Sequence, residues 1–144
     1  RQMCIRDSAT VEYTDNWEED AARRDFTLNA MSLDRAGKLY DYFGGYADAL
    51  KGHVRFVGDA AARIEEDFLR ILRLFRFYAQ VGKGPVDKAA LSACTKLAKG
   101  MTRLSKERIT QEMMKLLAAK NPLKSLEAMT EAGVLAVIFG VKRY

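Results

Sequence analysis

One stretch of the chain combines carboxylates with evenly spaced arginines. Residues 64–77 read Ile-Glu-Glu-Asp-Phe-Leu-Arg-Ile-Leu-Arg-Leu-Phe-Arg-Phe. Side chains three or four positions apart lie on neighbouring faces of a helix. The charged positions are therefore expected to form a slowly winding stripe, with Glu66, Arg70 and Arg73 in line and Asp67 and Arg76 at its edges.

The other positions of this stretch are mostly apolar, which predicts a helix that is buried around most of its circumference. Arginines on such a helix need partners, because an uncompensated buried charge is unfavourable. Two interpretations stay open from these residues. Either Glu66 and Asp67 hold Arg70 and Arg73 in an internal ladder of ion pairs, or the arginines bind an anionic ligand. The planar guanidinium fork suits phosphate and the edge of a base.

A second charged string is Arg23-Arg24-Asp25. The two arginines could donate hydrogen bonds to a ligand, and the aspartate could accept one from a sugar hydroxyl. The alternative for such a short string is a solvated charged turn. The string alone favours the turn, and only its combination with other motifs gives it functional meaning.

Composition limits the function classes without selecting one. The 144 residues include 24 basic and 19 acidic side chains, and this modest basic excess is compatible with nucleotide or nucleic-acid partners. No apolar run reaches the roughly 18 residues of a membrane span. Cys4 and Cys94 lack metal-type spacing and His53 is the single histidine. We therefore expect reduced thiols, no histidine-based metal site and a cytoplasmic protein.

The pattern of turns and apolar positions predicts an α+β fold in two parts. The first part, residues 1–59, is expected to contain extended segments at 9–13 and 54–57 and a hairpin of 31–33 with 38–41. Between the first of these and the hairpin we expect a loop or a short helix at 17–24 and a short helical turn at 25–31 with Asp25 as cap. The second part, residues 60–144, is expected to be all helical: 60–81, 87–99, 105–119, and a helix from Asn121-Pro122 to Gly133. Because residues 1–8 blend poorly with the rest of the chain and the end is abrupt, we expect a piece of a longer protein.

Three ordered motifs give the chain a family resemblance. They are Arg-Arg-Asp-Phe-Thr-x-Asn-Ala from residue 23, Asp-Tyr-Phe-Gly-Gly from residue 41, and Glu-Asp-x-x-Arg-x-x-Arg-x-x-Arg-Phe from residue 66. Together they resemble the class II tRNA nucleotidyltransferase/poly(A) polymerase family, and most closely its CCA-adding members. The resemblance implies the C-terminal part of a nucleotidyltransferase head domain followed by a helical neck. It also implies CTP, ATP and the tRNA 3′ end as partners, and no membrane.

The resemblance assigns roles to single positions. Arg24 is similar to a nucleotide-binding arginine, and Asp25 to a residue associated with ribose recognition. Asp67 and Arg70 resemble the pair that reads the base edge of the incoming nucleotide. The remaining assignments are nucleotide-holding arginines and supporting residues: Arg73 and Arg76, then Arg23, Asn29, Asp41 and Glu66. Asp41 with Gly44-Gly45 resembles a hinge or brace, and Leu104–Arg108 a structural helix start.

Base reading by one carboxylate and one guanidinium is chemically reasonable. Asp offers only acceptors and Arg only donors. Cytosine and adenine each present an exocyclic amine beside a ring-nitrogen acceptor, so one such pair suits both. Guanine and uracil present a carbonyl and a ring N–H, and each buried group left unpaired costs about 1–3 kcal/mol.

The resemblance also implies chemistry that this chain does not supply. Members of the family use two divalent ions, expected to be Mg²⁺, held by an Asp-x-Asp pair upstream of the position of Arg23. No such pair precedes Arg23 here, and the acidic run at 15–20 is interpreted as solvated. We therefore predict no catalytic or metal-binding residue in this chain, and no turnover by the chain alone.

Other functions share some of these features. Poly(A) polymerase of the same family carries all three motifs. A helical RNA-binding module without chemistry would account for the basic excess and the helices at 87–119. A purely structural helical adaptor would account for the core, but not for Arg23-Arg24-Asp25.

Overall fold

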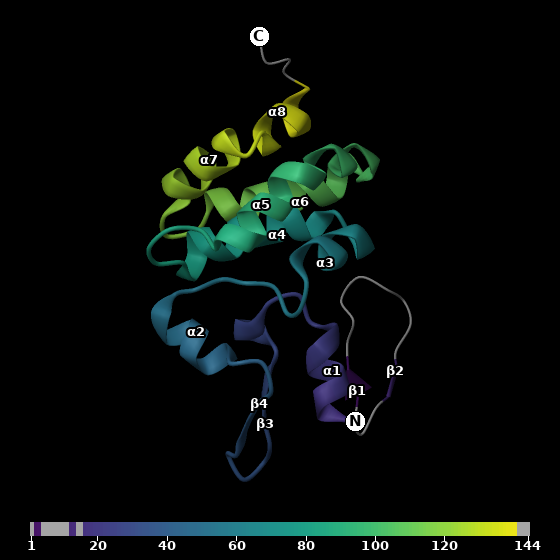
Figure 1. Cartoon of the computed structure of the whole chain (residues 1–144), viewed down its shortest axis with the longest axis vertical. Helices are drawn as coiled ribbons and strands as arrows, with labels where there is room; N and C mark the ends of the chain where they lie inside the picture. Colours follow the sequence, from purple (N-terminus) through teal and green to yellow (C-terminus); the bar gives the residue numbers. More distant parts are fainter. Residues whose placement is uncertain (1, 4–11, 14–15, 141–144) are drawn as a thin grey trace.

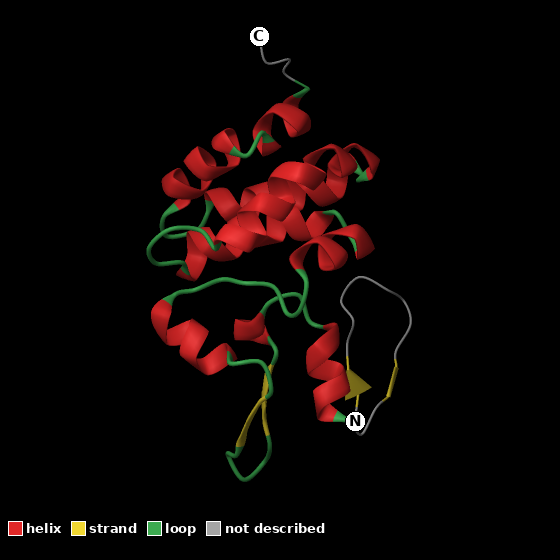
Figure 2. Cartoon of the chain, viewed as in Figure 1, coloured by secondary structure: helices red, strands yellow, loops and turns green. Residues whose placement is uncertain are grey.

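The computed structural model describes residues 2–3, 12–13 and 16–140, and it has two parts stacked along its long axis (Figures 1 and 2). The lower part in Figure 1 holds the hairpin and short helices, and the upper part is all helical. This arrangement confirms the predicted α+β class and the order of a mixed part before a helical part. Within the described residues, no helix has the length and apolar character to cross a bilayer.

The lower part consists of short elements. They are β1 (Gln2–Met3), β2 (Glu12–Tyr13), α1 (Trp17–Arg23), the 3-10 turn η1 (Thr27–Asn29), β3 (Met31–Leu33), β4 (Leu39–Asp41) and α2 (Gly45–Lys51). Strands β1 and β2 pair antiparallel, as do β3 and β4. Of the extended segment predicted at 9–13, residues 12–13 form β2 and the rest lies outside the described residues.

Helix α1 settles the open interpretation of residues 17–24 in favour of a short helix. Asn16 caps it, since its side-chain oxygen accepts a hydrogen bond from the Glu19 amide at 3.0 Å. Three acidic residues, Glu18, Glu19 and Asp20, occupy the first turn, where the helix dipole favours negative charge. Glu18 and Glu19 are exposed, as the solvated interpretation of the run predicted, and Asp15 lies outside the described residues. That interpretation is wrong for Asp20, which is only 6% exposed and lies 3.6 Å from Arg24 as an ion pair.

The β3–β4 hairpin was predicted correctly, because its signals are local. One side-chain oxygen of Asp34 accepts hydrogen bonds from the amides of Ala36 and Lys38, both at 2.9 Å. Gly37 takes a positive φ of 84°, which a residue with a Cβ rarely adopts. The turn chemistry thus fixes the register that pairs Met31 with Asp41.

Helix α2 was not predicted, because Gly44-Gly45 was interpreted as a break after the hairpin and, from the resemblance, as part of a hinge or brace. Asp41 starts this helix: its two carboxylate oxygens accept from the amides of Gly45 at 2.8 Å and Tyr46 at 2.9 Å. A Cβ at Gly45 would lie 2.0 Å from the carbonyl oxygen of Thr27. The motif thus lets a helix start pack directly against the backbone of η1.

The upper part contains α3 (Ala60–Glu66), α4 (Leu69–Val81), α5 (Lys88–Leu97), the 3-10 helix η2 (Ala98–Arg103), α6 (Lys106–Leu117), α7 (Pro122–Glu131) and α8 (Val134–Phe139). Helix α4 lies in the middle and packs against α6 and α7, while α3 packs against α5. Its apolar positions supply much of the core, which includes the fully buried Ile71, Leu72, Leu74 and Phe75. Arg70, Arg73 and Arg76 are partly exposed, and the exposed residues of α4 lie at its end, Gln80 and Val81.

The single helix predicted for 60–81 was wrong, because the chain breaks between α3 and α4. Asp67 is extended there, with φ of −157° and ψ of 109°. Its carboxylate accepts a hydrogen bond from the Leu69 amide at 3.1 Å, which satisfies a donor at the start of α4. A local hydrogen bond from the amide two positions on to the Asp67 carboxylate thus takes the place of helix continuation at this point.

Other boundaries also moved. Asp25 does not cap a helix through residue 31, since only Thr27–Asn29 is helical and Phe26 precedes it. The helix predicted for 87–99 ends at Leu97 and continues as η2. Ser105 caps α6 as expected, by accepting from the Arg108 amide at 3.3 Å. The apolar segment α8 was not predicted as a helix.

Candidate nucleotide site

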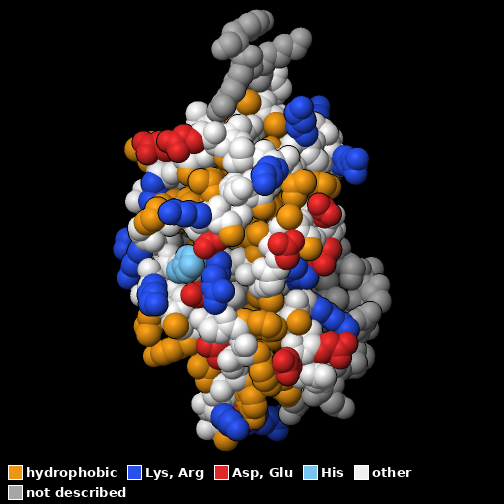
Figure 3. Space-filling view, viewed as in Figure 1, with side chains coloured by type: hydrophobic (Ala, Val, Ile, Leu, Met, Phe, Trp, Pro, Cys, Tyr) orange, Lys and Arg blue, Asp and Glu red, His pale blue; other side chains and the backbone are white. Residues whose placement is uncertain are grey.

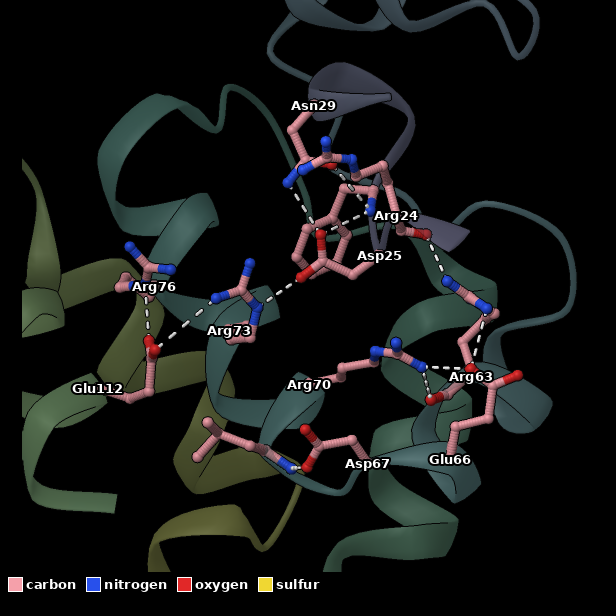
Figure 4. Close-up of polar contacts among 12 residues, drawn as sticks. Arg24, Asp25, Asn29, Arg63, Glu66, Asp67, Arg70, Arg73, Arg76 and Glu112 are labelled. Carbon is pink, nitrogen blue, oxygen red and sulfur yellow. Dashed lines mark hydrogen bonds and ion pairs between the residues drawn. The ribbon is translucent and has the colours of Figure 1, made fainter. Parts of the chain in front are cut away.

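The predicted site residues gather where the Arg23–Asp25 segment meets the α3–α4 junction (Figure 4). Asp25 is the most buried of them, with 7% of its side chain exposed. One carboxylate oxygen accepts from Arg73 Nε at 2.5 Å. The other accepts from Asn29 Nδ2 at 2.8 Å and from the Phe26 amide at 3.0 Å. Two segments far apart in the sequence are thus joined at one carboxylate.

These contacts decide the charge of Asp25. Burial raises the pKa of this carboxyl group, but the hydrogen bond and charge of Arg73, with the bonds from Asn29 and Phe26, outweigh it. The net pKa lies below the ordinary value of 3.8. Asp25 is therefore a firm anion at neutral pH.

A pH-dependent loss of stability is expected from this shift. Because the pKa of Asp25 is lower in the folded chain, its contribution is fully present above the unfolded value of 3.8 and is lost as the pH falls through the folded pKa. Urea unfolding at pH 7 should show Asp25→Asn to be less stable than the unmodified chain, by about 1–3 kcal/mol. Below pH 4 the difference should shrink, and a constant difference down to pH 2 would contradict this assignment.

Arg73 and Arg76 share a second carboxylate, Glu112, which the sequence analysis did not identify. Glu112, on α6, has a side chain only 5% exposed and lies 2.6 Å from Arg76 Nε as an ion pair, without meeting hydrogen-bond geometry. It also lies 3.9 Å from Arg73 Nη1. The guanidinium carbon of Arg76 stands 4.6 Å from the centre of the Phe77 ring, a cation–π contact. Arg73 and Arg76 are therefore fixed in place before any ligand binds.

Arg70 makes its contacts on the α3 side of the junction. Its Nη1 donates to Glu66 Oε2 at 2.6 Å and to the carbonyl oxygen of Arg63 at 2.7 Å. The hydrogen bond from Arg70 is the main reason that the pKa of Glu66 is lowered. The ladder interpretation is thus confirmed for Glu66 with Arg70, although the two residues lie on different helices.

Asp67 and Arg70 were predicted to act as a pair. In the described residues, their side chains form no hydrogen bond or ion pair with each other. Asp67 instead accepts from Arg108 Nη2, on α6, at 2.9 Å. Its side chain is 30% exposed and that of Arg70 is 19% exposed. In Figure 4, Asp67 lies below Arg70, and Asp25 and Arg73 lie above both. The ladder interpretation is wrong for Asp67, whose ion-pair partner is neither Arg70 nor Arg73.

The remaining predicted residues divide between the edge of the site and the scaffold. Arg24 is exposed and stands 3.6 Å from Asp20, while Arg23 pairs with Glu19 at 3.2 Å. Asn29 supports Asp25 directly. Asp41 lies elsewhere, at the start of α2, where its role is helix capping. The structure thus brings together the predicted positions except Asp41, and Arg23 takes part only through its backbone carbonyl, which accepts from Arg63.

Three residues at the site were missed by sequence reasoning: Arg63, Arg108 and Glu112. Arg63 immediately precedes the run at 64–77 and lies three positions before Glu66, which is the one signal that could have included it. Arg108 belongs to a string that was interpreted as structural only. For Glu112 the sequence carries no signal, because its partners lie 36 and 39 positions earlier.

The described part of the chain offers no metal centre. No cluster of three or more His, Cys, Asp or Glu side chains able to hold a metal ion occurs there. A hollow of about 460 Å³ lies between the 55–61 segment and α5, lined by Arg55, Asp59 and Lys96 among others, away from the arginine cluster. Burial raises the pKa of the Cys94 thiol to about 12, so that thiol is unreactive.

Comparison with protein families shows the class of protein to which the chain belongs. The poly A polymerase head domain family matches residues 2–55, and the family described as a probable RNA and SrmB-binding site of polymerase A matches residues 85–140. The two matches together take up most of the chain. The chain therefore belongs to the tRNA nucleotidyltransferase/poly(A) polymerase family.

Individual relatives narrow the resemblance within the family. The mitochondrial CCA tRNA nucleotidyltransferase 1 of Danio rerio is 46% identical over 128 residues, which is 88% of this chain and 30% of that protein. The CCA-adding enzyme of Bacillus licheniformis is 39% identical over 133 residues, 91% of this chain and 33% of that protein. The chain spans about a third of the length of these relatives.

Solved structures agree with the sequence comparison. The crystal structure of the Bacillus stearothermophilus CCA-adding enzyme in complex with CTP aligns with a TM-score of 0.81 and 35% identity, over 88% of this chain and 32% of that chain. The Thermotoga maritima CCA-adding enzyme complexed with tRNA aligns with a TM-score of 0.77 and 30% identity, over 89% of this chain and 32% of that chain. In both alignments, similarity of the backbone is accompanied by sequence identity over nearly nine-tenths of this chain.

Proposed function

We propose that this chain is part of an ATP(CTP):tRNA nucleotidyltransferase that adds CCA to tRNA 3′ ends. In this proposal the chain supplies the residues that select CTP and ATP. Its relatives include CCA-adding enzymes solved with CTP, with ATP and with tRNA, which supports these substrates. Residues 1–59 would belong to the head domain and residues 60–144 to the neck.

The observation that carries the proposal is the position of the Asp25 carboxylate relative to the α3–α4 junction. Arg73 joins Asp25 to the helix that also presents Arg70, with Asp67 just before it. A ribose hydroxyl at Asp25 and a base edge at Asp67 and Arg70 would thus be read by one connected set of side chains. Neither an RNA-binding module nor an adaptor needs that connection.

The partners of Asp67 and Arg70 imply a change of contacts when a nucleotide binds. Asp67 would exchange its bond to Arg108, and Arg70 part of its bonding to Glu66, for the Watson–Crick edge of cytosine or adenine. The exposed fractions of 30% for Asp67 and 19% for Arg70 leave both groups within reach of a ligand. The remaining contacts would keep each group oriented.

Catalysis itself is assigned outside these residues. We propose that Mg²⁺ is held by carboxylates that are not in this chain, as two-metal transfer to a hydroxyl requires. Among the residues present, Arg24, Arg73 and Arg76 carry the charge suited to the nucleotide's phosphates. The chain alone should then bind nucleotide without incorporating it into tRNA.

Nucleotide titrations test the proposal on the chain itself. Two-dimensional NMR titrations measure weak affinities, which suits a site that lacks part of its pocket. CTP and ATP should bind more tightly than UTP and GTP by about 5- to 150-fold, the effect of one unpaired buried group. Shifts should centre on Asp25, Asp67 and Arg70. Equal dissociation constants for all four nucleotides, or no measurable binding, would refute the proposal.

Poly(A) polymerase remains the second candidate, favoured by the description of the two matched families. That function predicts a preference for ATP over CTP in the same titrations.

Cytoplasmic localisation, expected from the reduced thiols, also stays a proposal. The Danio rerio and Mus musculus relatives are named as mitochondrial, so targeting would be tested by imaging the full-length protein.

A further inference from the structure

Arg63 touches both halves of the candidate site, although no motif drew attention to it. Its Nη2 donates to the backbone carbonyl oxygens of Arg23 at 2.7 Å and Arg24 at 2.5 Å. Its Nη1 donates to Glu66 Oε2 at 2.9 Å. Only 13% of this side chain is exposed. A single guanidinium therefore bridges the segment before Asp25 and the end of α3, as Figure 4 shows.

The same contacts continue to Arg70. The Glu66 oxygen that accepts from Arg63 also accepts from Arg70 Nη1 at 2.6 Å. That Nη1 donates in addition to the backbone carbonyl of Arg63 at 2.7 Å. Both acceptors that orient the Arg70 guanidinium thus depend on where Arg63 lies.

We propose that Arg63 is a positioning residue for nucleotide selection, which sets Arg70 relative to the Arg24–Asp25 segment. The inference rests on the proposed function, because it concerns the same site. A nucleotide has a fixed span from ribose to base edge. A group that fixes Arg70 with respect to Asp25 therefore decides whether the base meets its donor in line, and small misplacement weakens such contacts.

A merely structural role predicts something different. Arg63 would then stabilise the junction by satisfying two backbone carbonyls, and its loss would lower stability while leaving the choice between nucleotides unchanged. The two roles separate because selectivity is a ratio of affinities, in which a uniform loss of binding cancels. Lysine is an informative replacement, since its single ammonium keeps the charge but lacks the planar fork that reaches three acceptors in fixed geometry.

The experiment compares Arg63→Gln and Arg63→Lys with the unmodified chain and with Arg35→Gln as control. Arg35 is an exposed arginine in the β3–β4 turn, so its replacement removes the same charge away from the site. The measured quantity is the ratio of the UTP and CTP dissociation constants from NMR titrations. We expect that ratio to fall about 2- to 12-fold in Arg63→Gln, the effect of one weakened hydrogen bond. It should fall less in Arg63→Lys and stay unchanged in Arg35→Gln.

Each outcome decides a separate claim. An unmodified chain that does not prefer CTP to UTP removes the proposed function and this inference with it. A chain that does prefer CTP, with an unchanged ratio in Arg63→Gln, overturns the positioning role alone. Should Arg63→Gln fail to fold, Arg63→Lys carries the test. A ratio below that of the unmodified chain then supports the role, and an equal ratio overturns it.

Discussion

Replacing Asp67 by asparagine should abolish the preference of the chain for CTP and ATP. Asparagine keeps the size of the side chain but adds an N–H₂ donor beside its one remaining acceptor. It can therefore meet the carbonyl of uracil or guanine as well as the amine of cytosine or adenine. The ratio of the UTP and CTP dissociation constants should fall from about 5- to 150-fold to near one.

The control for this substitution is Glu107→Gln. Glu107 is an exposed carboxylate in the first turn of α6, the helix that also carries Arg108. Its neutralisation removes one negative charge on the same helix without touching Asp67 or Arg70. Selectivity should persist in this variant. If Asp67→Asn keeps the selectivity of the unmodified chain, then Asp67 serves only to cap α4 and to pair with Arg108.

The largest loss of stability is expected for Glu112→Ala. This carboxylate is 5% exposed and lies between Arg73 and Arg76, the latter only 12% exposed. Removing it leaves a largely buried guanidinium without its anion, an effect of about 3–5 kcal/mol in comparable buried pairs. Urea unfolding followed by circular dichroism measures the difference directly.

Glu107→Gln again supplies the comparison, since an exposed substitution on the same helix should change stability by no more than about 0.5 kcal/mol. A second variant separates charge from shape. Replacing Glu112 and Arg76 together by Leu and Met should recover part of the loss, because well-packed apolar residues can replace a buried ion pair. A Glu112→Ala chain as stable as the Glu107→Gln chain would show that the arginines do not depend on Glu112.

Local signals in the sequence were sufficient to predict those elements whose structure depends on residues close together in the chain. Asp34 and Gly37 define the β3–β4 turn within four positions, and Ser105 starts α6 through an amide three positions later. The run of arginines separated by apolar positions correctly indicated a buried α4. Each of these features is set by turn geometry, capping or helical period, all of which can be read from adjacent residues.

Prediction from the sequence was wrong or incomplete where two local preferences compete, and where interacting residues lie far apart in the chain. Asp67 fits a continuous helical pattern, but its carboxylate can also accept from the amide two positions on, and the chain adopts that extended conformation. The glycines after Asp41 were interpreted as a break, whereas their amides and small size allow α2 to start there. Long-range contacts such as Arg63 with Arg24 join positions 39 apart, which no periodicity reveals.

The distribution of surface side chains bears on the alternatives. On the face drawn in Figure 3, basic and acidic side chains are interspersed, and hydrophobic ones gather over the lower part. Exposed apolar residues of the hairpin and α2 are Leu33, Leu39, Tyr42, Tyr46 and Leu50. An RNA-binding module predicts clustered lysines and arginines, such as those around the histidine at the left of this view, but it gives no role to the connection of Asp25 with Arg73.

We propose that Asp67 and Arg70 act together as the surrogate partner of the incoming base. A structure of the chain with CTP bound would test this proposal without a substitution. The exocyclic amine of cytosine should lie within about 3 Å of the Asp67 carboxylate, and a guanidinium nitrogen of Arg70 at the same distance from the ring nitrogen. The ribose should lie against Asp25. Cytosine bound away from both side chains, with Asp67 still on Arg108 and Arg70 still on Glu66, would contradict the account.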